Sequence, residues 1–425
     1  MIKVLKYLSL GAFALLLVAC GSHNNGAATA LPANIRFVNA AQDRSLTVSL
    51  NGTAQISNVQ AASASGYVTV TSGTYAIAVT DTTGSLPSTA FSASLSAAQN
   101  YSLVAYVRDG AVVTSLIAEN QPVPASGDGT LGVANLSPDS GALDLYLVAP
   151  GTTSLSGLVP TFQSATYRAV PTWSIFVAGT FDIVGTAAGN PNDVRLRMSS
   201  VPVSSEQILL LALTSTSGGA LVNTVLVNQG GTVQIVPATN ARVRVVSALS
   251  VSGATPVTAT VGPTSLAPVF APNPGTYTLV AGNSSSYTIT AAGTPVATLP
   301  AATFATGGDF TILVYGAVAS PSVAIFTDTN QLPIVGGDVN LRLVNGGVNV
   351  AGGLTLYDNN VQVASEVAYG AASSYFSVPS ANSVLELVQP SAAPTSTTLL
   401  LGPTGSVYSV FVIDSTLTPY VIRDR

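Results

Sequence analysis

A short motif that recurs four times constrains the fold of this chain more than any other feature of its sequence. The four copies occupy residues 34–40, 131–136, 241–248 and 340–346. Successive copies lie about a hundred residues apart, which is within the usual size range of one domain. Self-similarity at a regular period indicates that one structural unit is repeated along the chain.

Further landmarks follow each copy at matching distances. A segment that alternates apolar and polar residues comes first, at 46–50, 143–147, 257–261 and 354–357. A Gly-Thr-aromatic segment follows, at 73–77, 179–183 and 275–279, with 382–387 in its place in the fourth repeat. A strongly apolar segment closes each repeat, at 101–106, 208–213, 310–315 and 408–413. Alternation with period two is typical of half-buried strands, so the sequence predicts an all-β chain of four tandem antiparallel β-sandwiches.

Short segments rich in Pro and Gly separate the repeats. We expect β-sandwich repeats at residues 34–127, 128–237, 238–336 and 337–425. The second repeat is the longest, which predicts an insertion of about ten residues near residues 152–167. Because the connecting segments are short, we expect neighbouring repeats to touch and the four to form a rod.

The first residues have the layout of a secretory signal. Lys3 and Lys6 precede an apolar run over residues 8–18, and small residues then lead to Cys20, the only cysteine. The apolar run is shorter than the ~20 residues that a membrane-spanning helix needs. Residues 17–20 resemble a bacterial lipobox, which implies a signal peptide at residues 1–19 and lipid on Cys20.

Lipidation of Cys20 makes the membrane a partner of this chain, because several acyl chains anchor a protein firmly. Residues 20–33 are small and polar and predict a flexible tether after the lipidated cysteine. Gly21 follows Cys20, and this resembles the pattern of lipoproteins that are sent to the outer membrane. We therefore expect a lipid-anchored protein of the bacterial cell envelope, with the outer membrane as its site.

Charged residues are scarce and mostly acidic. They make up 7% of the chain, and the part after the signal peptide has 11 Arg and no Lys against 18 acidic residues. Binding to nucleic acid or to anionic membrane patches needs basic clusters, so we expect no nucleic-acid partner. The only histidine, His23, lies in the predicted tether, where it cannot be held as a general base. This inventory also excludes a zinc site of the usual Cys/His kind, and we expect no cofactor.

Several segments resemble the bacterial domain of unknown function 4397. They are the four recurring motifs together with residues 135–139, 143–147, 274–277 and 310–316. The resemblance extends over almost all of the mature chain as four copies. It implies Ig-like β-sandwiches on a cell-envelope protein, and it supplies no catalytic residues because none are established for the family. Residues 41–44 and 346–348 depart from the Ser-Pro-Asp pattern seen at 137–139.

Two carboxylates form the nearest local pair that could serve a ligand or a reaction. Asp139 follows a Ser-Pro turn, and Asp144 lies on the next predicted strand. A glycoside hydrolase needs two acids roughly 5–10 Å apart, and loop carboxylates can also bind calcium. Turn formation for Asp139 and an outward strand position for Asp144 explain both residues without a ligand, and no calcium-loop motif is present.

Arg36, Arg244 and Arg342 occupy the same place in three copies of the recurring motif, and Gly132 takes that place in the second. These arginines could share a ligand contact. Alternatively, each covers a sheet edge or pairs with a neighbouring carboxylate, which would prevent edge-to-edge pairing. Trp173, the sole tryptophan, is either a core residue or a platform for a sugar.

Repetition without a catalytic inventory favours a non-catalytic function. We expect a lipid-anchored envelope or surface protein that acts as a binding, adhesion or scaffolding module, with a glycan or another envelope protein as its partner. A carbohydrate-binding module is the first alternative, and it requires exposed aromatic side chains on one face. A hydrolase that uses a carboxylate pair is the second alternative.

Overall fold

A computed structural model of the chain describes residues 31–250, 255–271, 274–347, 352–380, 383–389, 395–398, 405–413 and 419–425. The predicted signal peptide, Cys20, Gly21 and the tether up to residue 30 lie outside the described residues. The described part of the chain consists of β-strands and connecting segments without a helix. Within that part, no helix is therefore long and apolar enough to cross a membrane.

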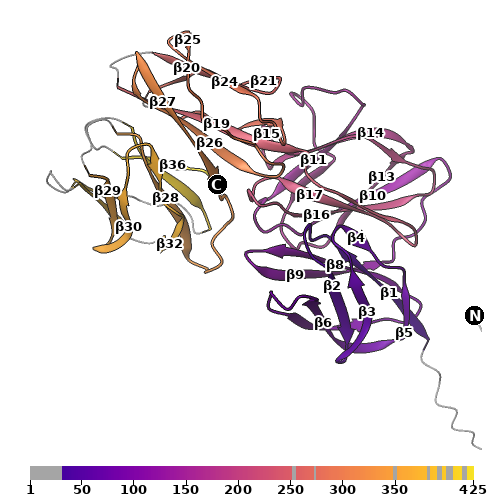
Figure 1. Cartoon of the computed structure of the whole chain (residues 1–425). Coiled ribbons are helices and arrows are strands. Elements are labelled where there is room, and N and C mark those ends of the chain that lie inside the picture. Colours follow the sequence, from indigo (N-terminus) through magenta and orange to yellow (C-terminus); the bar gives the residue numbers. More distant parts are fainter. Residues whose placement is uncertain are drawn as a thin grey trace, which may run out of the picture.

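Eight sheets form four sandwiches, which we number in chain order (Figure 1). In sandwich 1, the sheet order β4-β1-β8-β9, with β5 also on β1, faces the sheet β3-β2-β6-β7. Its strands are β1 (Pro32–Asn39), β2 (Leu46–Leu50), β3 (Thr53–Val59), β4 (Ser63–Ala64), β5 (Val68–Thr71), β6 (Gly73–Asp81), β7 (Thr89–Leu95), β8 (Asn100–Arg108) and β9 (Ala111–Glu119).

Sandwich 2 contains the sheets β13-β10-β16-β17-β18 and β12-β11-β14-β15. Its strands are β10 (Asp128–Asn135), β11 (Leu143–Val148), β12 (Phe162–Ala165), β13 (Thr172–Val177), β14 (Gly179–Ala187), β15 (Asn190–Val203), β16 (Ile208–Ser215), β17 (Val222–Asn228) and β18 (Val233–Val236). The predicted insertion is the connection between β11 and β12. It places Leu155 over Tyr146 and Val184, on the outer face of the second sheet.

Sandwich 3 contains the sheets β23-β19-β26-β27 and β21-β20-β24-β25, with β22 also on β20. Its strands are β19 (Asn240–Leu249), β20 (Pro256–Val261), β21 (Thr264–Ser265), β22 (Val269–Phe270), β23 (Thr278–Ala281), β24 (Tyr287–Ala291), β25 (Thr294–Pro295), β26 (Asp309–Ala317) and β27 (Ser320–Asp328).

Sandwich 4 contains the sheets β31-β28-β35-β36, with β32 also on β28, and β30-β29-β33-β34. Its strands are β28 (Asp338–Asn345), β29 (Leu354–Asp358), β30 (Val361–Val367), β31 (Ala371–Ala372), β32 (Phe376–Pro379), β33 (Val384–Val388), β34 (Thr395–Thr398), β35 (Val407–Val412) and β36 (Pro419–Arg423).

The predicted all-β architecture is confirmed, with one addition to its topology. In every sandwich the strand of the recurring motif pairs in parallel with the closing strand, as β1–β8, β10–β16, β19–β26 and β28–β35. The other strand pairs are antiparallel. A parallel pair needs a crossover connection, and here the crossover is the whole second sheet of the sandwich. We call the sheet that holds this parallel pair the motif sheet.

The motif sheets are buried on both faces. Ile35 and Phe37 of β1 join the core of sandwich 1, while Val38 of β1 and Val104 of β8 point outward. These outward residues pack against Leu210 and Val225 of sandwich 2. Fully burying a Val or Leu side chain contributes about 1.5–3 kcal/mol, so the outer faces hold sandwiches 1 and 2 together.

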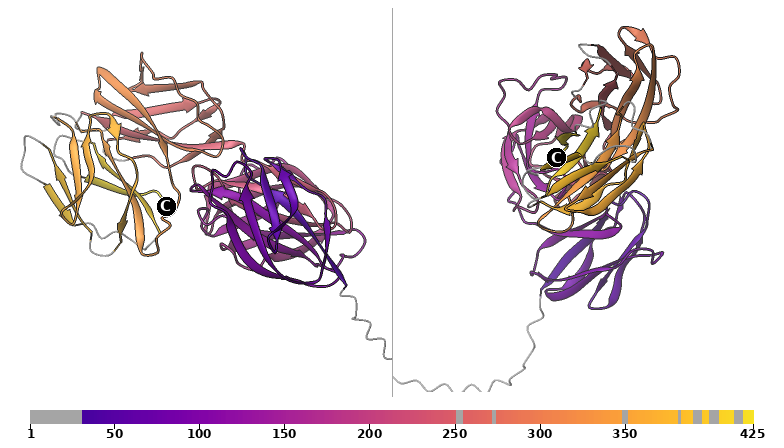
Figure 2. Two further views of the ribbon diagram at one scale, coloured as in Figure 1. Left: turned by 60° about the horizontal axis from the view of Figure 1, so that its bottom comes forward. Right: turned by 90° about the vertical axis from the view of Figure 1, so that its left-hand side faces the viewer.

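Sandwiches 3 and 4 pack through their motif sheets in the same way. Val246 and Leu313 of sandwich 3 meet Val344 and Phe411 of sandwich 4, and all four side chains are fully buried. The chain therefore forms two face-to-face pairs, which lie beside each other in Figures 1 and 2. The expected rod is wrong, because a linear arrangement would leave both of these apolar faces exposed to water.

One predicted correspondence in the third repeat is also wrong. The Gly-Thr-aromatic segments at 73–77 and 179–183 begin β6 and β14, which lie in the second sheet. The segment at 275–279 instead leads into β23, which pairs with the motif strand β19. The same residue types recur there for a different reason, because Tyr277 packs against the arginines of the motif strand.

Candidate functional site

A recurring cluster of four polar side chains lies between the paired sandwiches. Each copy contains the motif arginine, a tyrosine, a hydroxyl residue on the closing strand and a carboxylate from the last strand or the residue after it. The copies are Arg36, Tyr67, Ser102 and Glu119; Arg244, Tyr277, Thr311 and Asp328; and Arg342, Tyr375, Ser409 and Asp424. We call these the arginine clusters of sandwiches 1, 3 and 4.

The parallel strand pair positions two members of each cluster. The Cα of each motif arginine lies opposite the hydroxyl residue: Arg36 opposite Ser102, Arg244 opposite Thr311 and Arg342 opposite Ser409. Each Nε donates to that hydroxyl, at 2.7, 2.9 and 3.0 Å. The tyrosine ring covers the guanidinium, with 4.6–4.9 Å from Cζ to the ring centroid. Such stacking favours the charged guanidinium away from water.

In sandwich 1 the arginine and the carboxylate of the cluster form an ion pair with each other, and the arginine also contacts sandwich 2. Arg36 lies 2.9 Å from a carboxylate oxygen of Glu119, and both side chains are 3% exposed. The Tyr67 hydroxyl donates to Glu119 at 2.7 Å. Arg36 also donates to the backbone carbonyls of Asn228, at 3.0 Å, and Gly231, both in sandwich 2.

In sandwiches 3 and 4 the carboxylates are exchanged. Arg342 of sandwich 4 lies 2.6 Å from Asp328 of sandwich 3, and Arg244 of sandwich 3 donates to Asp424 of sandwich 4. Thr311 and Ser409 each receive a guanidinium hydrogen bond from the opposite sandwich as well, at 3.2 and 3.1 Å. The contacts are reciprocal, as in a two-fold symmetric dimer, although both partners belong to one chain.

Burial and charge act against each other in this pair of clusters. Burial by itself raises the pKa of Asp328, but Arg342 and Arg244, with hydrogen bonds from Thr311 and Tyr277, hold it below its ordinary value. Burial lowers the pKa of Arg244, yet Asp424 and Asp328 leave it above the ordinary value. Burial and the nearby carboxylates raise the pKa of Tyr277 well above 10. All of these groups therefore keep their charge states across the physiological range.

Sandwich 2 lacks the cluster because Gly132 replaces the arginine. Trp173 of the neighbouring strand β13 fills the space, and a Cβ at residue 132 would lie 2.5 Å from its ring. The indole packs half-buried at the seam with sandwich 1. Trp173 also lines a cavity of about 680 Å³ at this seam, together with Phe91 and Arg168.

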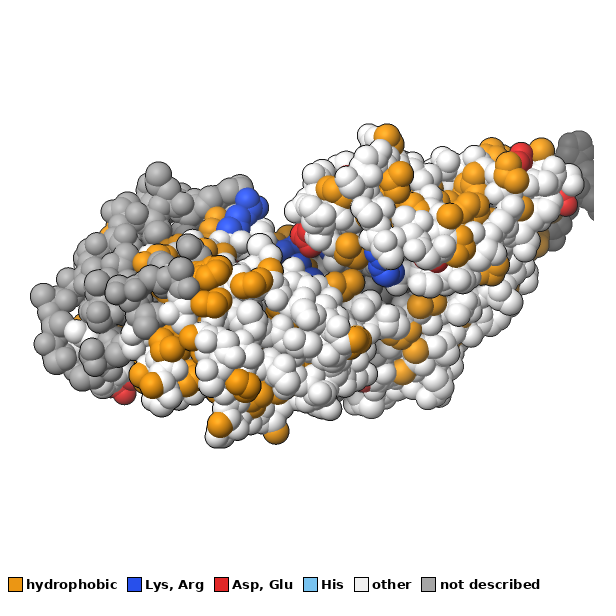
Figure 3. Space-filling view, turned by 90° about the horizontal axis from the view of Figure 1, so that it is seen from above, with side chains coloured by type: hydrophobic (Ala, Val, Ile, Leu, Met, Phe, Trp, Pro, Cys, Tyr) orange, Lys and Arg blue, Asp and Glu red, His pale blue; other side chains and the backbone are white. Residues whose placement is uncertain are grey.

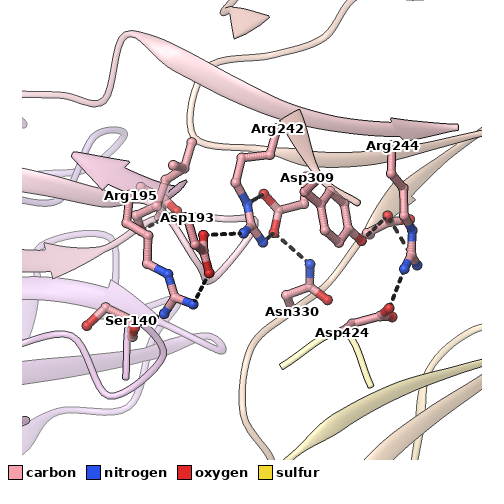
Figure 4. Close-up of polar contacts among 12 residues, drawn as sticks. Ser140, Asp193, Arg195, Arg242, Arg244, Asp309, Asn330 and Asp424 are labelled. Carbon is pink, nitrogen blue, oxygen red and sulfur yellow. Dashed lines mark hydrogen bonds and ion pairs between the residues drawn. The ribbon is translucent and has the colours of Figure 1, made fainter. Parts of the chain in front are cut away.

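A second polar network joins sandwich 2 to sandwich 3 (Figure 4). Asp193 of β15 lies 2.6 Å from Arg195 and 3.4 Å from Arg242, the residue two places before Arg244. Arg242 also makes two hydrogen bonds to Asp309, at 2.8 and 2.7 Å. Asn330 donates to Asp309 at 2.6 Å. We call these residues the central network.

The structure places Asp139 beside this central network, at a point where three parts of the chain meet. Its carboxylate accepts two hydrogen bonds from Arg108 of sandwich 1, at 2.8 and 2.6 Å. It also accepts from Ser215 at 3.0 Å and from the backbone N–H of Leu332, which lies between sandwiches 3 and 4, at 2.9 Å. Asp139 is fully buried, so its charge serves these contacts between sandwiches.

Asp144 and Asp139 have different hydrogen-bond partners. Its two oxygens accept hydrogen bonds from the backbone N–H groups of Ser164 and Gly189, both at 2.8 Å and both within sandwich 2. Asp144 therefore ties β11 to strand β12 and to the turn between β14 and β15. It alternates with the core residues Leu143 and Leu145, and it is buried by the two segments whose backbone donors it accepts from.

The five predicted site residues are thus not brought together at one surface. Arg36, Arg244, Arg342 and Asp139 all make contacts between sandwiches, which agrees with the pairing alternative for the arginines. Among the described residues, no group of three His, Cys, Asp or Glu side chains lies close enough to hold a metal ion. What the clusters do chemically is to fix the sandwiches relative to one another through buried, charge-assisted hydrogen bonds.

Sequence reasoning missed the tyrosines, the hydroxyl residues and the terminal carboxylates of the clusters. A signal for them exists in the spacing. The separation from arginine to hydroxyl residue is 66, 67 and 67 residues in the three copies. The tyrosines and the carboxylates keep nearly constant separations too, so a search for polar residues at similar distances from the motif arginine would have found the set.

Comparison with known proteins adds the following. Residues 33–146 match the family model described as "Domain of unknown function (DUF4397)", which confirms the resemblance over sandwich 1 and the start of sandwich 2. No curated protein matches the chain. Among solved structures, "The Bacillus anthracis TIE protein" is similar at 11% identity and a TM-score of 0.15, over 90% of this chain and 68% of that one.

Proposed function

We propose that this protein is a lipid-anchored protein of the bacterial cell envelope, with the outer membrane as its site, whose four sandwiches form one non-catalytic binding, adhesion or scaffolding body. The observation that carries the proposal is the placement of the arginines. Six of the 11 arginines after the signal peptide contact a neighbouring sandwich or the segment beside it: Arg36, Arg108, Arg168, Arg242, Arg244 and Arg342.

This placement supports a mechanical role. A chain with so few cations uses most of them to hold its sandwiches in fixed positions, and breaking a buried ion pair costs about 3–5 kcal/mol. On the face seen in Figure 3 the charged side chains are few, and the arginines gather along the hollow between the two halves. The rest of the described part of this face is mostly uncharged. A body of this kind presents loops and sheet edges at fixed distances from one another.

The anchor is tested by metabolic labelling of the full chain with a palmitate analogue in a bacterial host. We expect label on the wild-type chain, none on the Cys20→Ala variant, and accumulation of the larger precursor after globomycin treatment. Release of the wild-type chain from washed outer membranes in unlabelled form would contradict the anchoring part of the proposal.

A carbohydrate-binding module is a second candidate, and the cavity at the seam of sandwiches 1 and 2 favours it. Trp173 and Phe91 offer aromatic surface there, while Asn120, Gln121 and Arg168 offer polar groups. Ligand sites combine an apolar wall with a few polar groups in this way. Binding on a glycan array that is lost with Phe91→Ala would support this candidate, and an array without any signal from the wild-type chain would remove it.

A further inference from the structure

A second cavity lies inside sandwich 2, on the side that faces sandwich 3. Its volume is about 420 Å³. It lies between the edge strand β15 of one sheet and the edge strand β18 of the other, and the segment 237–240 and Leu279 of sandwich 3 close it from the outside. This size falls in the range of roughly 300–1,000 Å³ that is usual for small-molecule sites, which often lie at domain boundaries.

One part of the cavity wall consists of apolar residues, and polar residues such as Ser200, Gln234 and Thr239 line the rest. Leu196 and Met198 come from β15, Leu226 from β17 and Val236 from β18. Leu196, Met198 and Leu226 belong to the core of sandwich 2 and Val236 packs against it, so the cavity reaches that core. Met198 is unbranched and adapts its shape to irregular contents.

Sandwich 3 closes its own core differently. The segment before its closing strand β26 carries Phe304, which is fully buried and packs edge-on against Tyr287 and Phe310, with ring centroids 5.7 and 5.3 Å apart. The corresponding segment of sandwich 2, before β16, has Val201 and no aromatic ring.

A buried cationic donor lies at the cavity wall. Arg195 lines the cavity and is 9% exposed, and its Nε is buried without a hydrogen-bond partner among the described residues. Its other nitrogens donate to Asp193, at 2.6 Å, and to the backbone carbonyl of Ser140. Buried donors in native proteins are almost always paired with protein, water or a ligand. The Nε of Arg195 can therefore donate to an acceptor oxygen of a ligand.

Further positive charge surrounds this point. Nitrogens of Arg195 and Arg425 lie 3.6 and 3.4 Å from the position that a Cβ of residue 141 would occupy, so both guanidinium groups meet over Gly141. Burial, with repulsion from Arg195 and Arg242, lowers the pKa of Arg425 to about 9. Asp193 and Asp309 are the carboxylates nearby that hold these arginines in place.

We propose that this cavity binds a single-chain amphiphile whose hydrocarbon tail lies between the sheets of sandwich 2 and whose anionic head accepts a hydrogen bond from Arg195. The apolar walls specify the tail, and the Nε of Arg195 specifies the head, because a charged donor binds an anionic acceptor more strongly than a neutral one. The site goes beyond the envelope role proposed above and does not depend on it.

The test uses the full chain with Cys20→Ser, without detergent, and the fluorescent probe 11-(dansylamino)undecanoic acid. We expect saturable binding, displaced by dodecanoate or dodecyl phosphate and at least tenfold less well by 1-dodecanol. Displacement by dodecanoate alone would point to a free fatty acid, and displacement by both would point to a lipid with a phosphate head. Absence of saturable binding, or equal displacement by 1-dodecanol, would overturn the proposal.

Two matched variants locate the site. Leu279→Trp fills the cavity from sandwich 3, and Leu299→Trp makes the same change at another half-buried position of sandwich 3 that does not line it. We expect at least a tenfold loss of probe affinity in Leu279→Trp and no change in Leu299→Trp. Equal affinity in both variants would contradict the location. Arg195→Gln should abolish the preference for dodecanoate over 1-dodecanol while it leaves binding of the tail.

Discussion

The guanidinium of Arg342 lies 2.6 Å from the carboxylate of Asp328, and the two side chains belong to different sandwiches. Arg244 returns the contact from the other side by pairing with Asp424. The exposed fractions of these four side chains are 0–2%. Two copies of one fold within a single chain therefore bind each other as the subunits of a symmetric dimer do.

Removing one arginine of this exchange should destabilise the paired sandwiches strongly. Arg244→Ala leaves Asp424 buried without its cation, and we expect a loss of about 3–5 kcal/mol in the free energy of unfolding of sandwiches 3 and 4. Differential scanning calorimetry measures this loss. The method resolves separate transitions, which matters because the four sandwiches need not unfold in one step. Arg423→Ala is the matched control: Arg423 is exposed, and we expect a change within about 0.5 kcal/mol.

The double variant Arg244→Met with Asp424→Leu separates the stabilising effect of the ion pair from the cost of burying one charge without its partner. Replacing both partners by apolar residues is often neutral or stabilising, so we expect this variant to be more stable than Arg244→Ala. If Arg244→Ala unfolded at the same temperature as the wild type, the buried exchange would have no stabilising role.

We expect Gly132 to be required for stability, because the Trp173 ring occupies the space that a side chain at residue 132 would need. A Cβ at this position would lie 2.5 Å from the indole ring, so we expect Gly132→Ala to cost about 1–3 kcal/mol by overpacking. Trp173 is the only tryptophan, so its fluorescence follows the unfolding of sandwich 2 directly. Gly66→Ala is the control, because a Cβ there meets no atom within 4 Å.

A double variant checks that the indole is the cause. In the Trp173→Ala background, calorimetry should show that Gly132→Ala costs much less, since the ring it would strike is gone. An equal cost in both backgrounds would mean that Gly132 is required by the backbone and not by Trp173.

The stability of sandwiches 3 and 4 should fall in acid, because Asp328 then becomes protonated and loses its ion pair. Its pKa is lowered in the folded chain, so its contribution is complete above the unfolded pKa of about 3.9 and is lost as pH falls through the folded value. We expect the unfolding temperature of sandwiches 3 and 4 to be steady from pH 7 to 5 and to drop below about pH 4. Asp328→Asn should flatten this drop while it lowers the plateau. A drop of the same size in Asp328→Asn would assign the acid sensitivity to other carboxylates.

The sequence allowed the strands and the arginine positions to be predicted, because period-two alternation and the recurring motif are local signals. It gave no local signal for the partners of those arginines. Tyr277, Thr311 and Asp328 are far from Arg244 in the chain, and each residue alone has an ordinary role in a strand or turn. Only their constant spacing marks them.

The pairing of the sandwiches was missed for a different reason. Strands such as β16 are apolar at successive positions, and all eight of its residues are buried. Such runs are typical of sheets that are covered on both faces, whereas strands with one wet face alternate. The expectation of a rod rested on the short connecting segments and made no use of these apolar runs. Asp139 likewise looked like a turn residue because its partner Arg108 comes from another sandwich.

The central claim is that buried arginine clusters hold the sandwiches as one body, and the distance between two spin labels tests it most directly. Labels at the exposed positions Thr288 of sandwich 3 and Gln362 of sandwich 4 are introduced as cysteines in a full chain with Cys20→Ser. Double electron–electron resonance should give one narrow distance distribution in this chain, and a broad one when Arg244→Ala and Arg342→Ala are added. A broad distribution with both arginines intact, or a narrow one without them, would contradict the claim.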